Sequence, residues 1–480
     1  MVSFDGDYAS LGLQGQANLY SEHLATLRTR YDEAMTHFEL DAVVLASGSK
    51  SFYFQDDHAH PFHGYSGAQQ WLPFTLGSDT FVVLRLGQKP MLVWPVREDF
   101  WHAPYPVPSG DWQGEWDITL CRKEEGVSKK EESVSKKEES ASKKKKRWFD
   151  CLPSRTAWLG PESVELQAAL SLVAVPGLKA YVDFDKAVKT RFELAAMARA
   201  NVRGAAGHVA AKAAFLAGKS ELAVHLAFLQ ASGQSAFEEP YPGIVGLNEH
   251  AAVLHYEFKD SVSQAVSRSL LIDAGASEHG YASDITRTFV ANTSATESSE
   301  QDAEFAALLR DMNRLEEGLC AEVTSGVAFR DLHAVCLRGI AGVLYEHGVC
   351  RLGVEEQLAK RIPQVFFPHG LGHLLGLQVH DVGGHQVDKA GTLSLPTEDA
   401  PFLRLTRSLE ENMVVTIEPG LYFIPMLLEK MQASVPQHGC DLAKIKRLMP
   451  YGGIRIEDNV QVTAEKPVNL TREAFAKIGA

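Results

Sequence analysis

The segment Leu270-Leu271-Ile272-Asp273-Ala274-Gly275 is followed closely by Tyr281-Ala282-Ser283-Asp284-Ile285-Thr286-Arg287-Thr288. Each part is an apolar, strand-like run that carries one aspartate, and the glycine and polar residues between them favour a turn. We therefore predict a β-hairpin that brings Asp273 and Asp284 onto adjacent strands. The alternative is that the two aspartates cap turns or pair with Arg287, and this segment alone favours neither interpretation.

The residues on either side of this hairpin predict an α+β unit. Apolar residues recur at helical spacing over 305–319 and 332–344, and the alanine-rich stretch 190–218 also favours a helix. Further strand-like runs are Ala252–His255, Val414–Ile417 and Gly453–Ile456. We expect helices on one side of a largely antiparallel, curved sheet.

The first part of the chain has the pattern of a separate domain. At 480 residues the chain exceeds the usual size of a single hydrophobic core, so two domains are expected. Strand-like runs at 40–46, 81–84 and 91–94 are typical of an α/β unit, which we place at residues 1–188. The second domain is predicted to span residues 189–480.

A charged repeat interrupts the first domain at residues 122–147. The unit Val-Ser-Lys-Lys-Glu-Glu-Ser occurs at 127–133 and again at 134–140. The segment has almost nothing to bury, which predicts a flexible or loosely helical surface insertion. One apolar residue in each seven is too few for a coiled coil. The basic end of the repeat could contact anionic partners, but a solvated loop is the simpler interpretation.

The composition indicates an ordinary soluble, cytoplasmic protein. Hydrophobic residues make up 45% and charged residues 22% of the chain, and the formal net charge of −14 argues against a nucleic-acid-binding protein. The six cysteines form no Cys-x-x-Cys pair, which is typical of reduced thiols in the cytosol. We find no secretory signal and no apolar run near the roughly 18 residues of a membrane span.

Three histidines are concentrated in the segment from Phe366 to Asp381. His369, His373 and His380 lie within twelve residues of one another, among glycines and aliphatic side chains. A single histidine in such a place is usually a core residue or a hydrogen-bond partner. Three of them indicate a functional site, and the glycines permit close backbone approach to a ligand.

Two further acidic segments complete the candidate site. Glu418 precedes Pro-Gly, where it could be a simple turn residue. Arg455 and Glu457 share one face of a predicted strand, because side chains alternate along a strand. An ordinary salt bridge would explain that pair, but a metal ligand beside a guanidinium that can clamp an anion fits the other segments better.

Together the four segments supply five candidate ligands: Asp273, Asp284, His373, Glu418 and Glu457. Carboxylates are rare within such apolar segments unless something cationic holds them. An oxygen-dominated set with one nitrogen suits Mn²⁺, and Zn²⁺ or Co²⁺ less selectively. Five ligands are too many for one tetrahedral zinc ion but fit two metals that share bridging carboxylates. The residues therefore predict a dinuclear metallohydrolase.

These segments resemble those of metallopeptidases with the creatinase/methionine-aminopeptidase, or pita-bread, fold. Within that superfamily the chain is most similar to bacterial Xaa-Pro dipeptidases (prolidases), including the group also known as organophosphorus acid anhydrolases. The resemblance spans essentially the whole chain, and residues 369–384 and 452–459 carry its most specific motifs. It implies an N-terminal creatinase-like α/β domain and a pita-bread catalytic domain from about residue 189. The charged repeat departs from the family pattern.

The resemblance implies a role for each of the five ligands. Asp273 would chelate one metal, Asp284 and Glu457 would bridge the two ions, and His373 with Glu418 would complete the second site. The expected cofactors are two divalent ions, with Mn²⁺ preferred and Co²⁺ or Zn²⁺ as alternatives. Glu418 would also shuttle a proton from water to the prolyl nitrogen.

The resemblance also implies residues that face the substrate. His255 would stabilise charge on the tetrahedral intermediate, and His380 would act beside the metals and, with Arg455, bind the substrate carboxylate. The other substrate-binding candidates are His369, Tyr241 near the metals, and Asp57, which would reach across a dimer to the substrate amino group. One position departs from the family pattern: relatives often have a pocket tyrosine where this chain has Phe329.

The function that the resemblance implies is hydrolysis of Xaa-Pro dipeptides by a cytoplasmic homodimer, with no nucleic-acid or membrane partner. Promiscuous hydrolysis of organophosphate triesters is plausible, because a tetrahedral phosphorus centre resembles the intermediate of peptide hydrolysis. One alternative is an aminopeptidase P that acts on longer Xaa-Pro peptides. The other is a non-catalytic binding protein with this fold, which the complete ligand set disfavours, as it does a metal-independent creatinase-like hydrolase.

Overall fold

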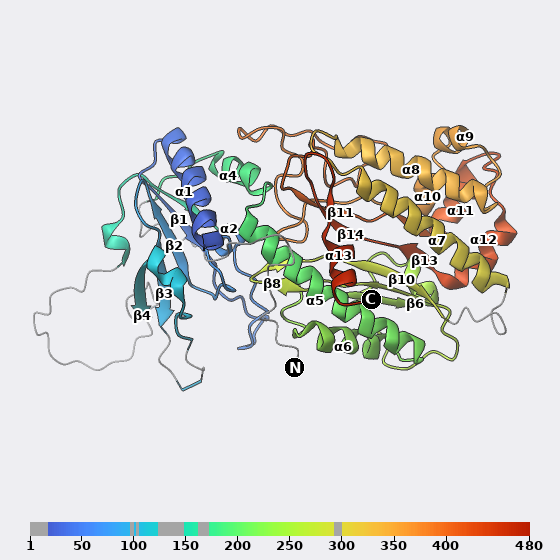
Figure 1. Cartoon of the computed structure of the whole chain (residues 1–480), viewed down its shortest axis with the longest axis horizontal. Helices are drawn as coiled ribbons and strands as arrows, with labels where there is room; N and C mark the ends of the chain where they lie inside the picture. The colour runs from blue at the N-terminus through green and yellow to red at the C-terminus, as the bar shows by residue number, and fades with distance from the viewer. Residues whose placement is uncertain (1–17, 97–99, 102–104, 123–147, 162–171, 292–299) are drawn as a thin grey trace, which may run out of the picture. The chain divides into compact units, whose positions relative to one another are not determined.

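The computed structural model describes residues 18–96, 100–101, 105–122, 148–161, 172–291 and 300–480 (Figure 1). The chain divides into two compact units, residues 1–185 and 186–480. The predicted insertion at 122–147 lies outside the described residues except for Arg122, which ends a strand.

The first unit is built on a five-stranded sheet with the order β4-β3-β2-β1-β5. The β1–β2 and β2–β3 pairs are antiparallel, whereas β3–β4 and β1–β5 are parallel. The three strands predicted in this part of the chain are confirmed as β1, β2 and β3. The bounds are β1 (Ala42–Ala46), β2 (Phe81–Arg85), β3 (Met91–Val96), β4 (Asp117–Arg122), β5 (Thr156–Leu159), α1 (Leu19–His37), α2 (Ser66–Gln69) and α4 (Leu178–Lys186), with 3-10 helices η3 (Asp111–Glu115) and η5 (Trp148–Cys151).

The core of the first unit lies between its sheet and its helices. Val43 and Leu45 of β1 are fully buried together with Trp71 and Trp94. Tyr31 of α1 meets the Trp71 ring edge-on, at 5.3 Å between ring centroids, an arrangement that aromatic pairs favour. Tyr31, Trp71 and Trp94 therefore belong to the hydrophobic core of this unit, together with aliphatic side chains.

Helices of the second unit confirm the predicted helical segments. Thr190 begins α5 with a capping box, in which its side chain and that of Glu193 each accept a backbone N–H. The helix ends before Gly218, whose φ of 69° suits glycine. The helices are α5 (Arg191–Leu216), α6 (Glu221–Ser232), α7 (Glu300–Ala321), α8 (Phe329–Glu346), α9 (Val354–Ala359), α10 (Pro363–Phe366), α11 (Pro425–Ser434), α12 (Leu442–Leu448) and α13 (Leu470–Lys477), with 3-10 helices η6 (Asn248–Ala252) and η7 (Met449–Tyr451).

Antiparallel pairs connect the named strands in the described part of the second unit. Four short sheets result, with the orders β10-β7-β6, β11-β14-β15, β12-β13 and β8-β9. The predicted α+β class is confirmed. The strands are β6 (Ile244–Leu247), β7 (Ser269–Asp273), β8 (Ser277–Glu278), β9 (Tyr281–Ala282), β10 (Thr286–Val290), β11 (Val414–Ile417), β12 (Gly420–Tyr422), β13 (Gly453–Arg455), β14 (Asp458–Gln461) and β15 (Val468–Asn469).

The predicted hairpin is present with one difference. Strands β7 and β10 pair in a register that places Thr286 opposite Asp273, so Asp284 lies two residues before β10. The small β8–β9 hairpin fills the connection between them. Arg287 forms its ion pair with Asp458, at 2.7 Å, which makes the alternative pairing of the aspartates with Arg287 wrong.

The strand predicted at Ala252–His255 is wrong. The 3-10 helix η6 and a turn occupy this region. Asn248 has a φ of 55°, and its side-chain amide bonds to the Val266 carbonyl and the Arg268 N–H. These side-chain hydrogen bonds to residues 18 and 20 positions further along the chain hold the start of the 3-10 helix in place of a strand.

A buried histidine on α8 should make the stability of the chain depend on pH. Burial lowers the pKa of His333 to about 4 from its ordinary value of 6.5. Between these values only the unfolded chain binds the proton, so the free energy of unfolding falls with decreasing pH by about 1.4 kcal/mol per pH unit. We expect His333→Phe to remove this contribution, as measured by urea unfolding at pH 7 and pH 5.

The control for that measurement is a pH range in which His333 is neutral in both the folded and the unfolded chain. Between pH 8 and pH 9, the free energies of unfolding of the wild type and His333→Phe should change in parallel. Equal pH slopes for the two proteins between pH 7 and pH 5 would contradict the prediction.

Candidate metal centre

The five candidate ligands come from the ends of strands and from the loop that packs against them. Asp273 ends β7, Asp284 precedes β10, and Glu418 follows β11 directly. Glu457 lies between β13 and β14 and bridges to Thr286. His373 lies in the loop after α10, beside the bridge that Leu374 forms with Val415.

The histidine loop approaches β11 closely because residue 372 is a glycine. A Cβ atom at Gly372 would lie 2.0 Å from the Thr416 carbonyl oxygen, so no other residue fits without moving the backbone. Thr416 donates its N–H to the His373 carbonyl at 2.9 Å, and the His373 N–H donates to the Thr416 hydroxyl at 3.1 Å. These contacts fix His373 in front of the strand that leads to Glu418.

Three of the five candidates converge in one buried cluster. Asp284, His373 and Glu457 each present a ligand atom within 4.8 Å of the other two, and they are 5%, 3% and 2% exposed. His373 Nε2 lies 3.5 Å from an Asp284 oxygen and 3.8 Å from a Glu418 oxygen. Glu418 therefore borders the cluster on the histidine side.

Asp273 is held by two neighbours. Arg455 donates to one carboxylate oxygen at 2.6 Å, and the Tyr241 hydroxyl donates to the other at 2.8 Å. Arg455 also donates to the hydroxyl of Thr286 at 3.1 Å, and Thr286 donates to Glu457 at 2.6 Å. Thr286 thus connects the Arg455 guanidinium to Glu457. The side chains of Arg455 and Glu457 therefore lie on the same side, as the sequence predicts.

The protonation of these carboxylates reflects burial and crowding. Burial, together with Asp284 and Glu418, raises the pKa of Glu457 well above its usual range. Burial raises the pKa of Glu418 to about 7 and also raises that of Asp273. Burial opposes ionisation of Asp284 too, but contact with His373 lowers its pKa.

This donor set fits divalent cations. Two buried and two partly buried carboxylates face one guanidinium and one imidazole, so negative charge stays uncompensated unless protons or cations bind. The His373 Nδ1 lies 3.0 Å from the Leu374 carbonyl oxygen, which can only accept. In neutral His373 the proton therefore sits on Nδ1, and the Nε2 lone pair faces Asp284 and Glu418, as in a metal-ligating histidine.

Tyr422, which the sequence did not indicate as a site residue, connects Arg455 to His369 through its hydroxyl group. The Tyr422 hydroxyl lies 2.9 Å from both an Arg455 nitrogen and His369 Nε2. His369 Nδ1 lies 2.8 Å from the Gly370 carbonyl and must donate to it, so Tyr422 donates to Nε2. Burial lowers the pKa of His369 to about 3, which keeps the ring neutral.

Two other predicted histidines lie beside this group. The His380 ring meets the His373 ring edge-on, with 4.4 Å between centroids. Burial and the neighbouring His373 lower the pKa of His380 to about 4. His255 is an exposed residue of the turn after η6, and it has a minor electrostatic effect on the lowered pKa of both His369 and His380.

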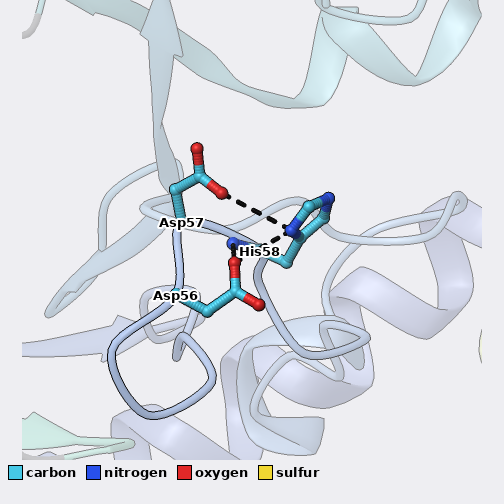
Figure 2. A group of neighbouring side chains, drawn as sticks. All are labelled: Asp56, Asp57 and His58. Carbon is cyan, nitrogen blue, oxygen red and sulfur yellow. Dashed lines mark hydrogen bonds and ion pairs between the residues drawn. The ribbon is translucent and has the colours of Figure 1, made fainter.

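Asp57 belongs to the first unit and is almost fully exposed. Figure 2 shows it beside Asp56 and His58, with His58 Nδ1 2.9 Å from an Asp56 oxygen and 3.4 Å from an Asp57 oxygen. All three side chains face solvent, where such groups occur commonly without a bound ion. Phe329, the departure from the family pattern, is fully buried in the hydrophobic core of the second unit.

Another acidic cluster has enough hydrogen-bond donors without a metal. Glu221, next to His250 and Asp260, accepts hydrogen bonds from two backbone N–H groups, the His250 ring and the Tyr256 hydroxyl. Both carboxylate oxygens are thereby occupied. This glutamate holds the loop that carries His255.

Two family models match the chain. Residues 195–464 match the model for metallopeptidase family M24, and residues 18–145 match the model for the N-terminal domain of Xaa-Pro dipeptidase. An Xaa-Pro dipeptidase of Stenotrophomonas maltophilia is 40% identical over 96% of this chain and 98% of its own length. An Xaa-Pro dipeptidase of Pseudoalteromonas atlantica is 38% identical over 96% of this chain and 99% of its own length.

Solved structures show the same fold at lower identity. Aminopeptidase PepP of Pseudomonas aeruginosa has a TM-score of 0.68 and 21% identity, and covers 96% of this chain and 97% of its own. Aminopeptidase P of E. coli, with the inhibitor Pro-Leu, has a TM-score of 0.67 and 20% identity at the same coverage.

The chain belongs to metallopeptidase family M24, with a pita-bread catalytic domain and an N-terminal domain like that of Xaa-Pro dipeptidases. The prediction of a metallopeptidase with this fold is confirmed. Among the helices in the described ranges, none has the length and apolar character needed to cross a bilayer.

Proposed function

We propose that the chain is a metal-dependent dipeptidase that hydrolyses Xaa-Pro dipeptides. The observation that carries this proposal is the buried cluster of Asp284, His373 and Glu457. It occurs in a chain that is 38–40% identical, over 96% of its length, to proteins named Xaa-Pro dipeptidase. A small substrate that carries both a carboxylate and a prolyl amide is consistent with the charged groups around the cluster.

Asp273, Asp284, His373, Glu418 and Glu457 would hold two divalent ions, for which we propose Mn²⁺. When bound, such ions supply Lewis acidity, which polarises a carbonyl group and makes water more acidic. The predominance of carboxylate oxygens over nitrogen favours Mn²⁺, with Co²⁺ or Zn²⁺ as weaker candidates.

Glu418 would act as the proton shuttle. Its carboxylate oxygen lies 3.8 Å from His373 Nε2, at the border of the cluster where the attacking water would be held. It would accept a proton from the attacking water and deliver it to the prolyl nitrogen, which leaves poorly unless it is protonated. His255 would stabilise charge on the tetrahedral intermediate, and His380 would act beside the metals and help Arg455 to bind the substrate carboxylate.

Arg455 would bind the substrate carboxylate. Its hydrogen bonds to Thr286, Tyr422 and Asp273 use three of the five N–H groups of a guanidinium, and we assign the other two to the substrate. His369, which burial keeps neutral and which accepts a hydrogen bond from Tyr422, would line the same side of the pocket. A carboxylate anchored here would restrict the enzyme to dipeptides, because a third residue would occupy the same space.

The remaining proposals concern the whole protein. Residues 1–188 would form the creatinase-like domain, and residues 189–480 the catalytic domain. A cytoplasmic homodimer would bring Asp57 of one copy to the substrate amino group in the other, while Tyr241 steadies Asp273. Organophosphate triesters would be promiscuous substrates of the same centre.

Comparison of Gly-Pro with Gly-Pro-Xaa tripeptides tests the proposed specificity. With Mn²⁺ added to purified protein, we expect Gly-Pro to have a kcat/KM about 10- to 100-fold higher, since a hydrogen-bonded charge contributes roughly 1.5–3 kcal/mol. A preference for the tripeptide would support an aminopeptidase P instead. Protein that binds no metal and stays inert with Mn²⁺ would support the non-catalytic alternative.

A further inference from the structure

A buried side-chain amide joins two of the candidate metal ligands. The Asn459 side chain is fully buried, and its Oδ1 accepts the Asp284 N–H at 3.0 Å. Its Nδ2 donates to the Asp284 carbonyl oxygen at 2.5 Å. Both backbone polar groups of Asp284 are thus satisfied by one side chain located two residues after Glu457.

The register of the strands explains this arrangement. Thr286 and Glu457 form an isolated antiparallel bridge, and the Glu457 N–H donates to the Thr286 carbonyl at 3.1 Å. In that register Asp284 lies opposite Asn459. The backbone of Asn459 belongs to β14, where it pairs with Thr416 of β11. The backbone of Asn459 is therefore not available to Asp284, and the Asn459 side-chain amide forms the two hydrogen bonds to the Asp284 backbone instead.

The C-terminal helix α13 holds the backbone of Asn459. The Thr471 hydroxyl accepts the Asn459 N–H at 2.9 Å and donates to the Asn201 side chain at 2.7 Å. Asn201 lies on α5 and donates to the Met197 carbonyl at 2.9 Å. The hydrogen-bonded chain thus runs from the Asp284 backbone to two packed helices, α13 and α5.

The same helix also fixes the residue between Glu457 and Asn459. Asp458 accepts hydrogen bonds from Arg472 at 2.6 Å, Asn469 at 2.8 Å and Arg287 at 2.7 Å. Arg287 donates in addition to the Glu457 carbonyl at 2.9 Å. The backbone on both sides of Glu457 is therefore restrained by buried polar contacts.

We infer that Asn459 is a positioning residue for the metal centre, and that α13 holds it in place through Thr471. Asn459 clamps the backbone of Asp284 to the segment that carries Glu457. The distance between these two carboxylates is thereby set before any ion binds. This inference rests on the proposed role of both residues as metal ligands, which is part of the proposed function.

Metal affinity is the property that separates positioning from general stability. We would measure Mn²⁺ binding to metal-stripped wild type, Asn459→Ala and Thr471→Val by competition with a chelator. Asn459→Ala should bind Mn²⁺ about 10- to 100-fold more weakly, the usual cost of removing a group that orients a ligand. Thr471→Val keeps the Asn459 side chain but removes the hydroxyl that accepts the Asn459 N–H. The Mn²⁺ affinity of this variant should therefore lie between those of Asn459→Ala and the wild type.

Gln357→Ala is the matched control. Gln357 on α9 is also fully buried, and its amide donates to the carbonyls of Ala341 and Leu352 at 3.0 and 2.9 Å. Its loss should lower the thermal midpoint of the metal-free protein without changing Mn²⁺ affinity. If Asn459→Ala does not fold, Thr471→Val against this control still tests the inference.

The outcomes distinguish this inference from the proposed function. If Asn459→Ala and Thr471→Val bind Mn²⁺ as tightly as the wild type and Gln357→Ala do, the positioning role is overturned, even if the wild type hydrolyses Gly-Pro. A wild type that binds no Mn²⁺ would overturn it as well. A wild type that binds Mn²⁺ through Asn459-dependent geometry but leaves Gly-Pro intact would refute only the dipeptidase.

Discussion

Glu457→Gln is expected to give a folded protein that has lost most of its metal binding and activity. Glu457 is 2% exposed, and burial, together with the nearby Asp284 and Glu418, raises its pKa well above the usual range. The amide has nearly the same shape but no charge, so it relieves repulsion in the metal-free protein while removing a ligand. Because the metals contribute several kcal/mol to transition-state stabilisation, kcat/KM should fall by about a thousandfold or more.

The two opposite effects of this substitution make it diagnostic. Urea unfolding of the metal-free protein at pH 8 should show Glu457→Gln to be more stable than the wild type, while Mn²⁺ stabilises the wild type far more. Glu355→Gln, at a site that is 78% exposed, serves as the control and should change neither property. A Glu457→Gln variant that is less stable without metal but binds Mn²⁺ normally would refute a ligand role.

Arg455→Ala is expected to destabilise the metal-free protein by about 3–5 kcal/mol, the usual cost of breaking a buried ion pair. The guanidinium lies 2.6 Å from Asp273, and the two side chains are 6% and 13% exposed. Its removal leaves the Asp273 charge without its partner in a crowded acidic site. Hydrogen bonds to Tyr422 and Thr286 are lost as well.

An exposed arginine is the control for this second substitution. Arg338 pairs with Glu355 at the surface, where its side chain is 55% exposed, so Arg338→Ala should leave stability essentially unchanged. Urea unfolding compares the two variants directly. Similar midpoints for Arg455→Ala and the wild type would show that Asp273 does not depend on this partner. If Arg455 also anchors substrate, the KM for Gly-Pro should rise.

The sequence predicted those parts of the fold that depend on local patterns. The capping box at Thr190 and the glycine after α5 set both ends of that helix, so its bounds followed from the chain alone. Strand β7 contains the uninterrupted apolar run Leu270–Ile272, and such runs indicate strands directly. The segment after Asn248 was predicted wrongly, because side-chain hydrogen bonds to residues about 20 positions away decide its backbone.

In the candidate site, too, the sequence predicted residues that belong to distinctive segments but not the contacts between residues far apart in the chain. Segments with unusual carboxylates and histidines pointed to Asp284, His373 and Glu457, which the structure brings together. Tyr422 gave no signal, because a tyrosine in a short strand is ordinary and its partners lie on other segments. Asn459 lies in the 452–459 motif, but its contact could not be predicted for the same reason: its partner Asp284 is 175 residues away.

Hydrolysis of Gly-Pro by the chelator-stripped protein, before and after Mn²⁺ is restored, tests the central claim most directly. The account predicts that activity disappears with the metal and returns when Mn²⁺ is added to the wild type. Mn²⁺ added to Glu457→Gln should restore almost nothing. Gly-Pro hydrolysis that persists in the metal-free protein, or that Glu457→Gln retains in full, would contradict a metal-dependent dipeptidase built on this cluster.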